Sequence, residues 1–342
     1  MFAVFRKEYD DFMMSQKMTE NNHITKNDMT KQSFAEQAGI ALKRAIGGDV
    51  EVLIQNVRKN NGIVLTGVSI FSKDKNMSPT IYLESSYEQY LDGGSMEEIV
   101  KELYACYSEN CPEDAFDTDF FLDYQLARER IAYRLVSREK NQNLLEEVPF
   151  IPYLDMAITF FCKIQHEELG CGMIQIKNEH LRLWGVEKER LFYDAEQNMH
   201  RLCPELICTM QELLENAGNE QEIPEDMLRE ADEAGKLQMM VVTNSDKSYG
   251  AAVILYEGVL ARLSERMQSS LAILPSSVHE MIVLPVKSEE EAAAFCEMVH
   301  EINETQVDPE EVLTDSVYFY GKHTHTLTIS HKKIDESTEK GI

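Results

Sequence analysis

The densest cluster of side chains that could do chemistry lies between two apolar segments of the C-terminal half and comprises Ser276, Ser277, His279 and Glu280. A hydroxyl, an imidazole and a carboxylate together form the relay of a serine hydrolase. In that interpretation one of the two serines is the nucleophile, His279 is its base, and Glu280 orients the base. The segment also lies in a predicted turn on a rigid sheet, where binding groups tend to occur. These four residues are therefore the first candidate site.

Two features of the same segment weigh against catalysis. Adjacent side chains of an extended chain point to opposite faces, so His279 and Glu280 cannot easily share one relay. The sequence Gly-x-Ser-x-Gly of a nucleophile elbow surrounds neither Ser276 nor Ser277. Turn capping and local hydrogen bonding are the simpler interpretation of these residues.

His-Glu dipeptides occur at His166, His279 and His300, which raises the possibility of a composite metal site. A metal ion needs three or four ligands that converge on one point, and none of the dipeptides has the His-Glu-x-x-His spacing that places two ligands on one helical face. The abundance of glutamate explains the dipeptides by chance. Walker A and Gly-x-Gly-x-x-Gly sequences are absent, so we predict neither a metal nor a nucleotide cofactor.

Arg130, Arg134 and Arg138 recur at a spacing of four residues within a segment, residues 118–143, that we predict to be one long helix. Such spacing makes a basic stripe on one helical face. The stripe could bind an anionic ligand. We favour the alternative that the helix uses it to dock on the acidic surface of the protein itself.

Charge narrows the classes of partner. The chain of 342 residues has 60 acidic and 33 basic residues and a net charge of -27, yet residues 1–94 hold 12 acidic and 11 basic ones. The acidity therefore belongs to the rest of the chain, where it repels phosphate backbones and anionic lipids. We expect no membrane and no nucleic-acid partner, and a basic protein partner instead.

The cysteines and the apolar pattern indicate a compartment. The seven cysteines form no Cys-x-x-Cys pair, which favours reduced thiols over a disulfide framework. Charged residues occupy the N-terminal segment where a signal peptide has its apolar region, and no stretch approaches the roughly 18 apolar residues of a membrane span. We predict a cytoplasmic location.

The pattern of elements predicts an α+β fold with a small N-terminal domain. Residues 1–28 lack an apolar face and are predicted to be a flexible extension. Residues 29–112 should form a helix, three strands and a second helix, with Asn61-Gly62 as the turn of a hairpin and Ser95 with Glu98 as a capping box. The helices are predicted over residues 30–46 and 96–107, and the strands over residues 50–57, 63–71 and 80–83.

A linking helix over residues 113–147 and a larger α+β domain over residues 148–330, with one mixed sheet and helices, should follow, before a polar tail over residues 331–342. Pro204 is predicted to begin a helix, and the acidic run from Glu205 onward is typical of a solvated face or connector. The further predicted strands are residues 156–164, 173–176, 237–243, 251–255, 271–274, 281–286, 317–320 and 327–329, and the helices are residues 187–199 and 289–302.

Several stretches together resemble one known family. The strongest are residues 273–280 and 303–307, and the others are residues 79–83, 87–90, 133–136, 140–141, 176–180, 184–185 and 250–252. Over about residues 29–330 the chain is similar to an uncharacterised bacterial family, the domain of unknown function 5688 of anaerobic gut Firmicutes. The resemblance implies an architecture and no mechanism.

These observations favour a cytoplasmic, non-enzymatic interaction or regulatory protein with a strongly acidic surface. The alternative is a hydrolase or a metal-dependent enzyme that uses the turn from Ser276 to Glu280. The two hypotheses differ in what surrounds His279: a pocket shared with a second histidine and two carboxylates favours the enzyme, and an isolated, solvent-facing imidazole favours the binding protein.

Overall fold

The structure is a computed structural model, and it describes residues 29–47, 49–72, 78–111, 119–166, 170–209, 212 and 239–331. The predicted extension over residues 1–28, the tail after His331 and nearly all of the acidic run after Thr209 lie outside the described residues. Helices and antiparallel sheets occur along the chain, so the prediction of an α+β fold is confirmed. The chain divides into two compact units, one of residues 1–59, 64–118 and 167–170 and one of the remaining residues.

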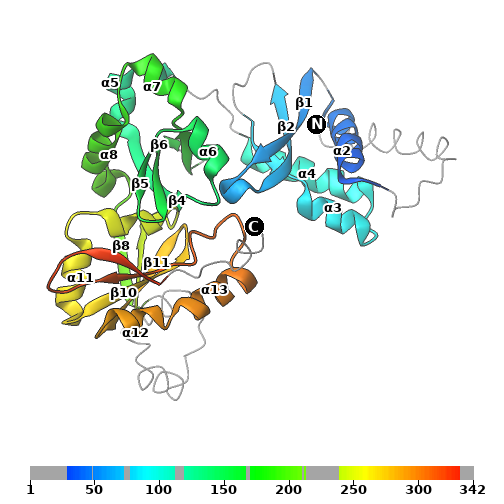
Figure 1. Ribbon diagram of the computed structural model, residues 1–342. Coiled ribbons are helices and arrows are strands. Elements are labelled where there is room, and N and C mark those ends of the chain that lie inside the picture. The colour runs from blue at the N-terminus through cyan, green and yellow to red at the C-terminus, as the bar shows by residue number, and fades with distance from the viewer. Residues whose placement is uncertain are drawn as a thin grey trace, which may run out of the picture. The chain divides into compact units, whose positions relative to one another are not determined.

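The first unit is a three-stranded antiparallel sheet with helices packed against it (Figure 1). The predicted hairpin is confirmed, because β1 and β2 pair from Val50 opposite Ser72 to Arg58 opposite Val64, and Asn61 and Gly62 have φ angles of 58° and 71°. The predicted capping box of Ser95 is also present. The elements are α2 (Lys31–Ile46), β1 (Val50–Arg58), β2 (Val64–Ser72), β3 (Thr80–Tyr82), α3 (Glu84–Leu91) and α4 (Met96–Asn110).

The second unit contains two sheets, where the sequence predicted one mixed sheet. One has six strands in the order β13-β12-β10-β11-β9-β8, and the other has the order β4-β6-β5 with β7 paired to β6. Every pairing with a described register in these sheets is antiparallel. The strands are β4 (Ile131–Ser137), β5 (Phe150–Tyr153), β6 (Met156–His166), β7 (Gly170–Gln175), β8 (Glu205–Thr209), β9 (Met240–Asn244), β10 (Ser270–Ser277), β11 (Glu280–Val286), β12 (Val317–Tyr320) and β13 (Leu327–His331).

Helices of the second unit pack against these strands. Figure 1 shows α8 beside β4, and α12 and α13 below the six-stranded sheet. The helices are α5 (Tyr124–Ala127), α6 (Gln142–Glu147), α7 (Asn178–Trp184), α8 (Lys188–Leu202), α11 (Val259–Met267), α12 (Glu289–Ala293) and α13 (Cys296–Thr305), and the 3-10 turns are η3 (Asp119–Leu122), η4 (Arg128–Arg130) and η6 (Gly250–Leu255). None of the helices in the described part of the chain is both long and apolar enough for a membrane crossing.

The predicted linking helix over residues 113–147 is wrong. Its central part is strand β4, which pairs with β6 from Ile131 opposite Cys162 to Ser137 opposite Met156, and six of its seven residues are buried. Apolar residues four apart, such as Ile131 and Leu135, share a face of a strand as well as of a helix. The spacing therefore could not distinguish the two, and sheet pairing decided the outcome.

Two shorter predictions also fail. The segment after Pro204 is strand β8 and not a helix, because proline is tolerated beside the first residue of a strand as well as in a first helical turn. Residues 251–255 belong to η6 and not to a strand. A Cβ atom at Gly250 would lie 2.6 Å from the carbonyl oxygen of His279, so the chain enters η6 in close contact with the β10–β11 turn.

Candidate functional site

The four residues that sequence reasoning placed first lie at the β10–β11 turn: Ser276 and Ser277 end β10, His279 is in the turn, and Glu280 begins β11. The hydroxyl of Ser276 donates to Oε1 of Glu280 at 3.1 Å, and the hydroxyl of Ser277 accepts the backbone N–H of His279 at 3.0 Å. The pairing of the strands shifts between Pro275 and Ser277, where the chain bulges. Both serine hydroxyls thus stabilise the turn, as turn capping predicts.

The imidazole of His279 contacts two other segments of the chain. Its Nδ1 accepts the backbone N–H of Tyr249 at 3.0 Å, and its Nε2 lies 3.4 Å from Oε1 of Glu311. Because Nδ1 is an acceptor, the neutral ring holds its proton on Nε2, the nitrogen that lies near Glu311. The backbone supports the same arrangement, since the N–H of Val278 donates to the carbonyl of Glu311 at 2.8 Å. The geometry assigns His279 to holding segments together.

The structure brings one of the predicted arginines to this turn. The guanidinium of Arg134 lies 4.5 Å from the ring centroid of Tyr249, whose ring is 5.4 Å from that of His279. Nη2 of Arg134 also donates to Oε1 of Gln175 at 2.5 Å. Burial lowers the pKa of this guanidinium, and the neighbouring Tyr249 opposes that shift. Arg134, Tyr249, His279 and Glu311 form a row of contacts that sequence spacing did not indicate.

The other two arginines of the predicted stripe lie elsewhere. The guanidinium of Arg130 stacks 4.2 Å from the ring centroid of Phe120, and Arg138 follows β4 near Asp155. On a strand, with a rise of about 3.3 Å per residue, four residues span about 13 Å. One small ligand therefore cannot bind to Arg130, Arg134 and Arg138 at the same time.

His279 and His300, from two of the three His-Glu dipeptides, contact different acidic residues. Nε2 of His300 lies 3.2 Å from Glu304 and its Nδ1 lies 3.7 Å from Asp315, while Glu167 is outside the described residues. No group of three or more His, Cys, Asp or Glu side chains that could hold a metal ion occurs in the part of the chain that the structure describes.

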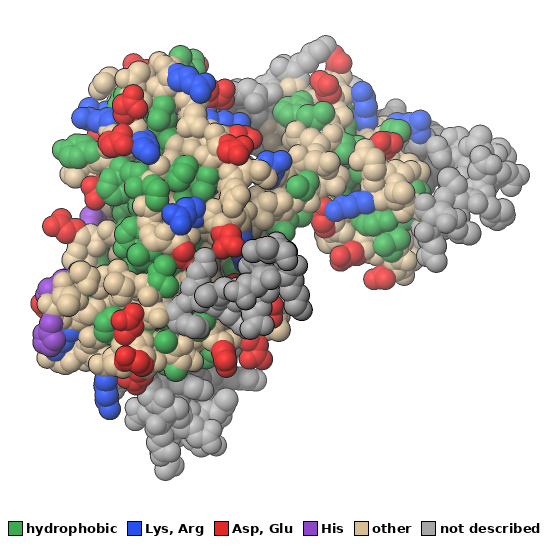
Figure 2. All heavy atoms as spheres, in the orientation of Figure 1, with side chains coloured by type: hydrophobic (Ala, Val, Ile, Leu, Met, Phe, Trp, Pro, Cys, Tyr) green, Lys and Arg blue, Asp and Glu red, His purple; other side chains and the backbone are tan. Residues whose placement is uncertain are grey.

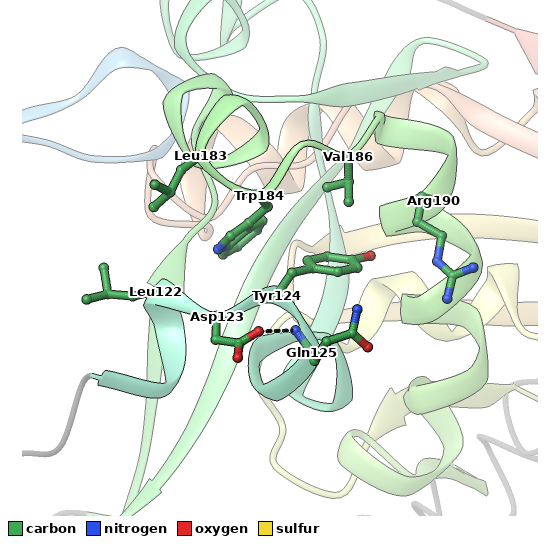
Figure 3. Close-up of a pocket in the computed structure, with 8 residues that line it drawn as sticks. All are labelled: Leu122, Asp123, Tyr124, Gln125, Leu183, Trp184, Val186 and Arg190. Atoms are coloured by element: carbon green, nitrogen blue, oxygen red, sulfur yellow. Dashed lines mark hydrogen bonds between the residues drawn. The ribbon is translucent and has the colours of Figure 1, made fainter.

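A hollow that sequence reasoning missed lies where α5, α7 and α8 meet. It has a volume of about 660 Å³. Figure 3 shows the rings of Trp184 and Tyr124 side by side, with Leu122 and Leu183 on one side and Arg190 on the other. Its lining combines apolar and aromatic side chains with polar ones. The apolar and aromatic residues are Leu122, Tyr124, Leu183, Trp184 and Val186, and the polar residues are Asp123, Gln125 and Arg190; we call the eight together the apolar pocket, after the first group.

Local chain geometry positions this pocket. Asp123 is the N-cap of α5 and accepts the backbone N–H of Gln125 at 2.8 Å (Figure 3). Helix α7 ends at Gly185 in a left-handed conformation with φ of 64°, which glycine adopts without strain. This turn lets the chain reverse from α7 into α8, so Trp184 and Arg190 face the same hollow.

The polar atoms of the pocket floor already have partners. The indole N–H of Trp184 donates to the carbonyl of Phe121 at 3.0 Å, and the hydroxyl of Tyr124 donates to Oδ2 of Asp194 at 2.6 Å. Asp194 also accepts from Nε of Arg190 at 2.9 Å. Burial and then the bond to Asp194 raise the pKa of Tyr124 above its usual value, so the hydroxyl stays a neutral donor. The two rings are therefore held in fixed orientations with their apolar surfaces facing the hollow.

Leucine side chains at the edge of this pocket are exposed. Leu122 is 67%, Leu183 is 61% and the neighbouring Leu126 on α5 is 57% exposed. Burying one leucine side chain contributes about 1.5–3 kcal/mol, so a partner that covers them gains appreciably. Apolar side chains gathered around a hollow are typical of an interaction site.

A second hollow, of about 600 Å³, adjoins the first along α8 and shares Arg190 with it. Figure 2 shows green hydrophobic, blue basic and red acidic side chains interspersed over the upper-left part of the molecule, where these helices lie. The second hollow is lined by Arg128, Glu129, Arg190, Tyr193, Asp194, Gln197, Asn198 and Arg201, and we call these residues the arginine hollow.

Sequence reasoning had weak signals for this region. The pair Trp184-Gly185 marks a helix end, but a packed aromatic residue and a pocket floor have the same sequence pattern. The exposed leucines lie in helices of four and seven residues, which are too short for a period to separate a buried face from an exposed one.

Residues 31–322 match the model of DUF5688, a family of unknown function. No curated protein and no solved structure matches the chain significantly.

Proposed function

The chain belongs to the DUF5688 family, and because the family description names no activity, we propose from the side-chain geometry that it is a non-enzymatic interaction or regulatory protein. In this proposal it binds a segment of another protein at the apolar pocket. The function thus rests on a surface of the second unit and not on the residues that could do chemistry.

One observation carries the proposal: exposed Leu122 and Leu183 border a hollow whose floor is made of Trp184 and Tyr124. Rigid aromatic residues surrounded by aliphatic ones are what the centres of protein interfaces contain. The floor needs no rearrangement before binding, because its polar atoms are bonded within the protein. Preformed rings lower the entropy cost of association.

The remaining acidic surface completes the proposal. Residues 203–342 hold 27 acidic and 10 basic residues, and Figure 2 shows red side chains over the region that carries α12. Such a surface favours a partner with a basic surface and disfavours nucleic acid. A cytoplasmic location in a bacterium, an anaerobic gut Firmicute, is also proposed, from the free cysteines and the resemblance of the sequence.

The alternative of a hydrolase or metal-dependent enzyme stays a prediction from sequence. A base must reach the proton that it abstracts. At the β10–β11 turn the hydroxyl of Ser276 donates to Glu280, and Nδ1 of His279 accepts from Tyr249. These bonds support a structural role for the turn, so we put the interaction function first.

The test is affinity purification of the tagged full chain from the source organism with quantitative mass spectrometry. We compare the wild type with the double variant Leu122→Ser/Leu183→Ser and with Leu91→Ser, which changes an exposed leucine on α3 of the first unit. A partner set that falls at least about tenfold in the double variant and persists in Leu91→Ser supports the proposal. Equal recovery of the same proteins by all three chains would contradict it.

A further inference from the structure

We propose that the segment bound at this surface is an acidic peptide with one bulky apolar anchor. The anchor occupies the apolar pocket, and carboxylates of the same segment bind Arg128 and Arg201 in the arginine hollow. This inference rests on the proposed interaction function, and it adds the chemistry of the partner segment.

The first support is the bonding of the arginines. Nη1 of Arg128 donates to Oε1 of Gln125 at 3.4 Å, and Nη2 of Arg201 donates to Oδ1 of Asn198 at 3.1 Å and to the backbone oxygen of Glu129. All three acceptors are neutral. Among the described residues no carboxylate forms an ion pair with either guanidinium, whereas Arg190 pairs with Asp194. Each guanidinium has five N–H donors, so both can still bind a carboxylate.

The acidic side chains beside the arginines are mostly engaged. Asp123 caps α5, and Asp194 accepts from both Tyr124 and Arg190. Glu129 is exposed and is the remaining acidic residue of the two hollows. Two guanidinium charges thus face one carboxylate whose side chain has no described bond, which leaves the hollow locally positive.

The regional charge agrees with this local excess. Residues 121–202, which contain every residue of the two hollows, hold 11 basic and 13 acidic residues. Residues 203–342 hold 10 and 27. Within the second unit, the excess of negative charge is therefore smaller in residues 121–202 than in residues 203–342, so an acidic segment meets less repulsion around these helices. Complementary charge then selects an acidic segment over a basic one.

The two hollows also predict a spacing within the partner segment. Arg190 borders the apolar pocket, and Arg201 lies eleven residues further along α8. At about 1.5 Å per helical residue these positions are about 16 Å apart. An extended segment covers that length in about five residues. An anchor residue with acidic residues within about five positions of it fits both hollows.

The test begins with a phage-displayed library of random dodecapeptides selected on the full chain. We expect enriched peptides to combine a Leu, Phe, Trp or Met anchor with two or more Asp or Glu residues. The tightest peptide is then synthesised with a fluorescent label, and its Kd is measured by fluorescence polarisation at low and high salt. Binding should weaken as salt screens the arginines.

Variants then assign the binding site of that peptide. Leu183→Ser should raise its Kd at least about tenfold, and Arg128→Ala and Arg201→Ala should each raise it about three- to tenfold. Lys287→Ala, which removes an exposed positive charge after β11, is the matched control and should leave the Kd unchanged. Thermal unfolding of each variant confirms that it folds.

The outcomes separate this inference from the proposed function. Enriched peptides that are basic or uncharged, yet lose binding in Leu183→Ser, overturn the acidic character of the bound segment and leave the interaction function standing. Two results, each combined with unchanged partner recovery from cells, overturn both the acidic segment and the interaction function. The first is a peptide whose Kd is unchanged in Leu183→Ser, and the second is a selection that yields no specific binder.

Discussion

The β10–β11 turn and the apolar pocket differ in whether their side chains are bonded within the protein or exposed to a partner. At the turn, Ser276, Ser277 and His279 all have partners inside the protein. At the pocket, Leu122 and Leu183 extend into solvent although neither residue carries a reactive group. The comparison teaches that residue type indicates which chemistry is conceivable, while the availability of a group depends on what the fold has already bonded to it.

The difference has a physical origin in the two local architectures. A turn between paired strands lies against neighbouring segments, and buried polar groups there must be satisfied by the protein. The carbonyl of His279, for example, accepts from Oγ1 of Thr243 at 2.7 Å. Short helices joined by tight turns leave side chains that cannot all reach the core. Leu183 at the end of α7 is such a residue.

The largest expected effect is at Gly250, which touches the turn. A Cβ atom there would lie 2.2 Å from Oγ1 of Thr243 and 2.6 Å from both the backbone nitrogen of Asn244 and the carbonyl oxygen of His279. Because two of these atoms are backbone, Gly250→Ala should cost about 3 kcal/mol of unfolding free energy, measured by urea denaturation. Gly172→Ala, whose Cβ would meet nothing closer than 3.8 Å, is the control and should change stability by less than about 0.5 kcal/mol. A tolerated Gly250→Ala would mean that the turn is less tightly held than this geometry requires.

The second largest loss of stability is expected at the β10–β11 turn itself. The double variant His279→Ala/Glu280→Ala leaves the backbone N–H of Tyr249 without its acceptor and should cost about 1–3 kcal/mol, seen in thermal melts. Partner binding at the apolar pocket should be unchanged. His323→Ala, at an exposed turn, is the control. Lost binding with unchanged stability would reverse the comparison and make the turn the functional site.

A smaller effect is expected within the pocket floor. Tyr124→Phe removes the hydroxyl that donates to Asp194 but keeps the ring, so it should cost about 1 kcal/mol and change peptide binding little. Tyr193→Phe, on an exposed ring of α8, should have no measurable effect on the unfolding midpoint. If Tyr124→Phe abolished binding instead, the hydroxyl rather than the apolar surface would carry recognition.

The smallest effect on stability is expected at the pocket edge. Leu122→Ser and Leu183→Ser should each change the unfolding free energy by less than about 0.5 kcal/mol, because both side chains are exposed. Leu191→Ala, at a fully buried position of α8, should cost about 2–5 kcal/mol in the same chemical denaturation series. If Leu122→Ser or Leu183→Ser lowered the unfolding free energy as much as Leu191→Ala, these leucines would stabilise the fold and would not be available to a partner.

Much of the fold followed from local pattern. The Asn61-Gly62 turn, the capping box of Ser95 and helix α8 are confirmed close to their predicted positions. Each depends on residues near one another in sequence, where backbone preferences and short-range bonds dominate. The segment 118–143 was misread because Ile131 and Leu135 fit a helix and a strand equally well, and pairing with β6 is a long-range event.

Composition and local order thus sufficed for the α+β class, the hairpins and the uneven charge of this protein, since these depend on residue type and on neighbours in the chain. Only the tertiary structure decided which of the candidate site residues contact one another. It placed His279 against Tyr249, separated Arg130 from Arg138 along a strand, and brought Leu122 and Trp184, from elements about sixty residues apart, to one pocket. The physical reason is that burial and bonding are settled by contacts between distant segments, and those contacts determine which side chains remain available to a partner.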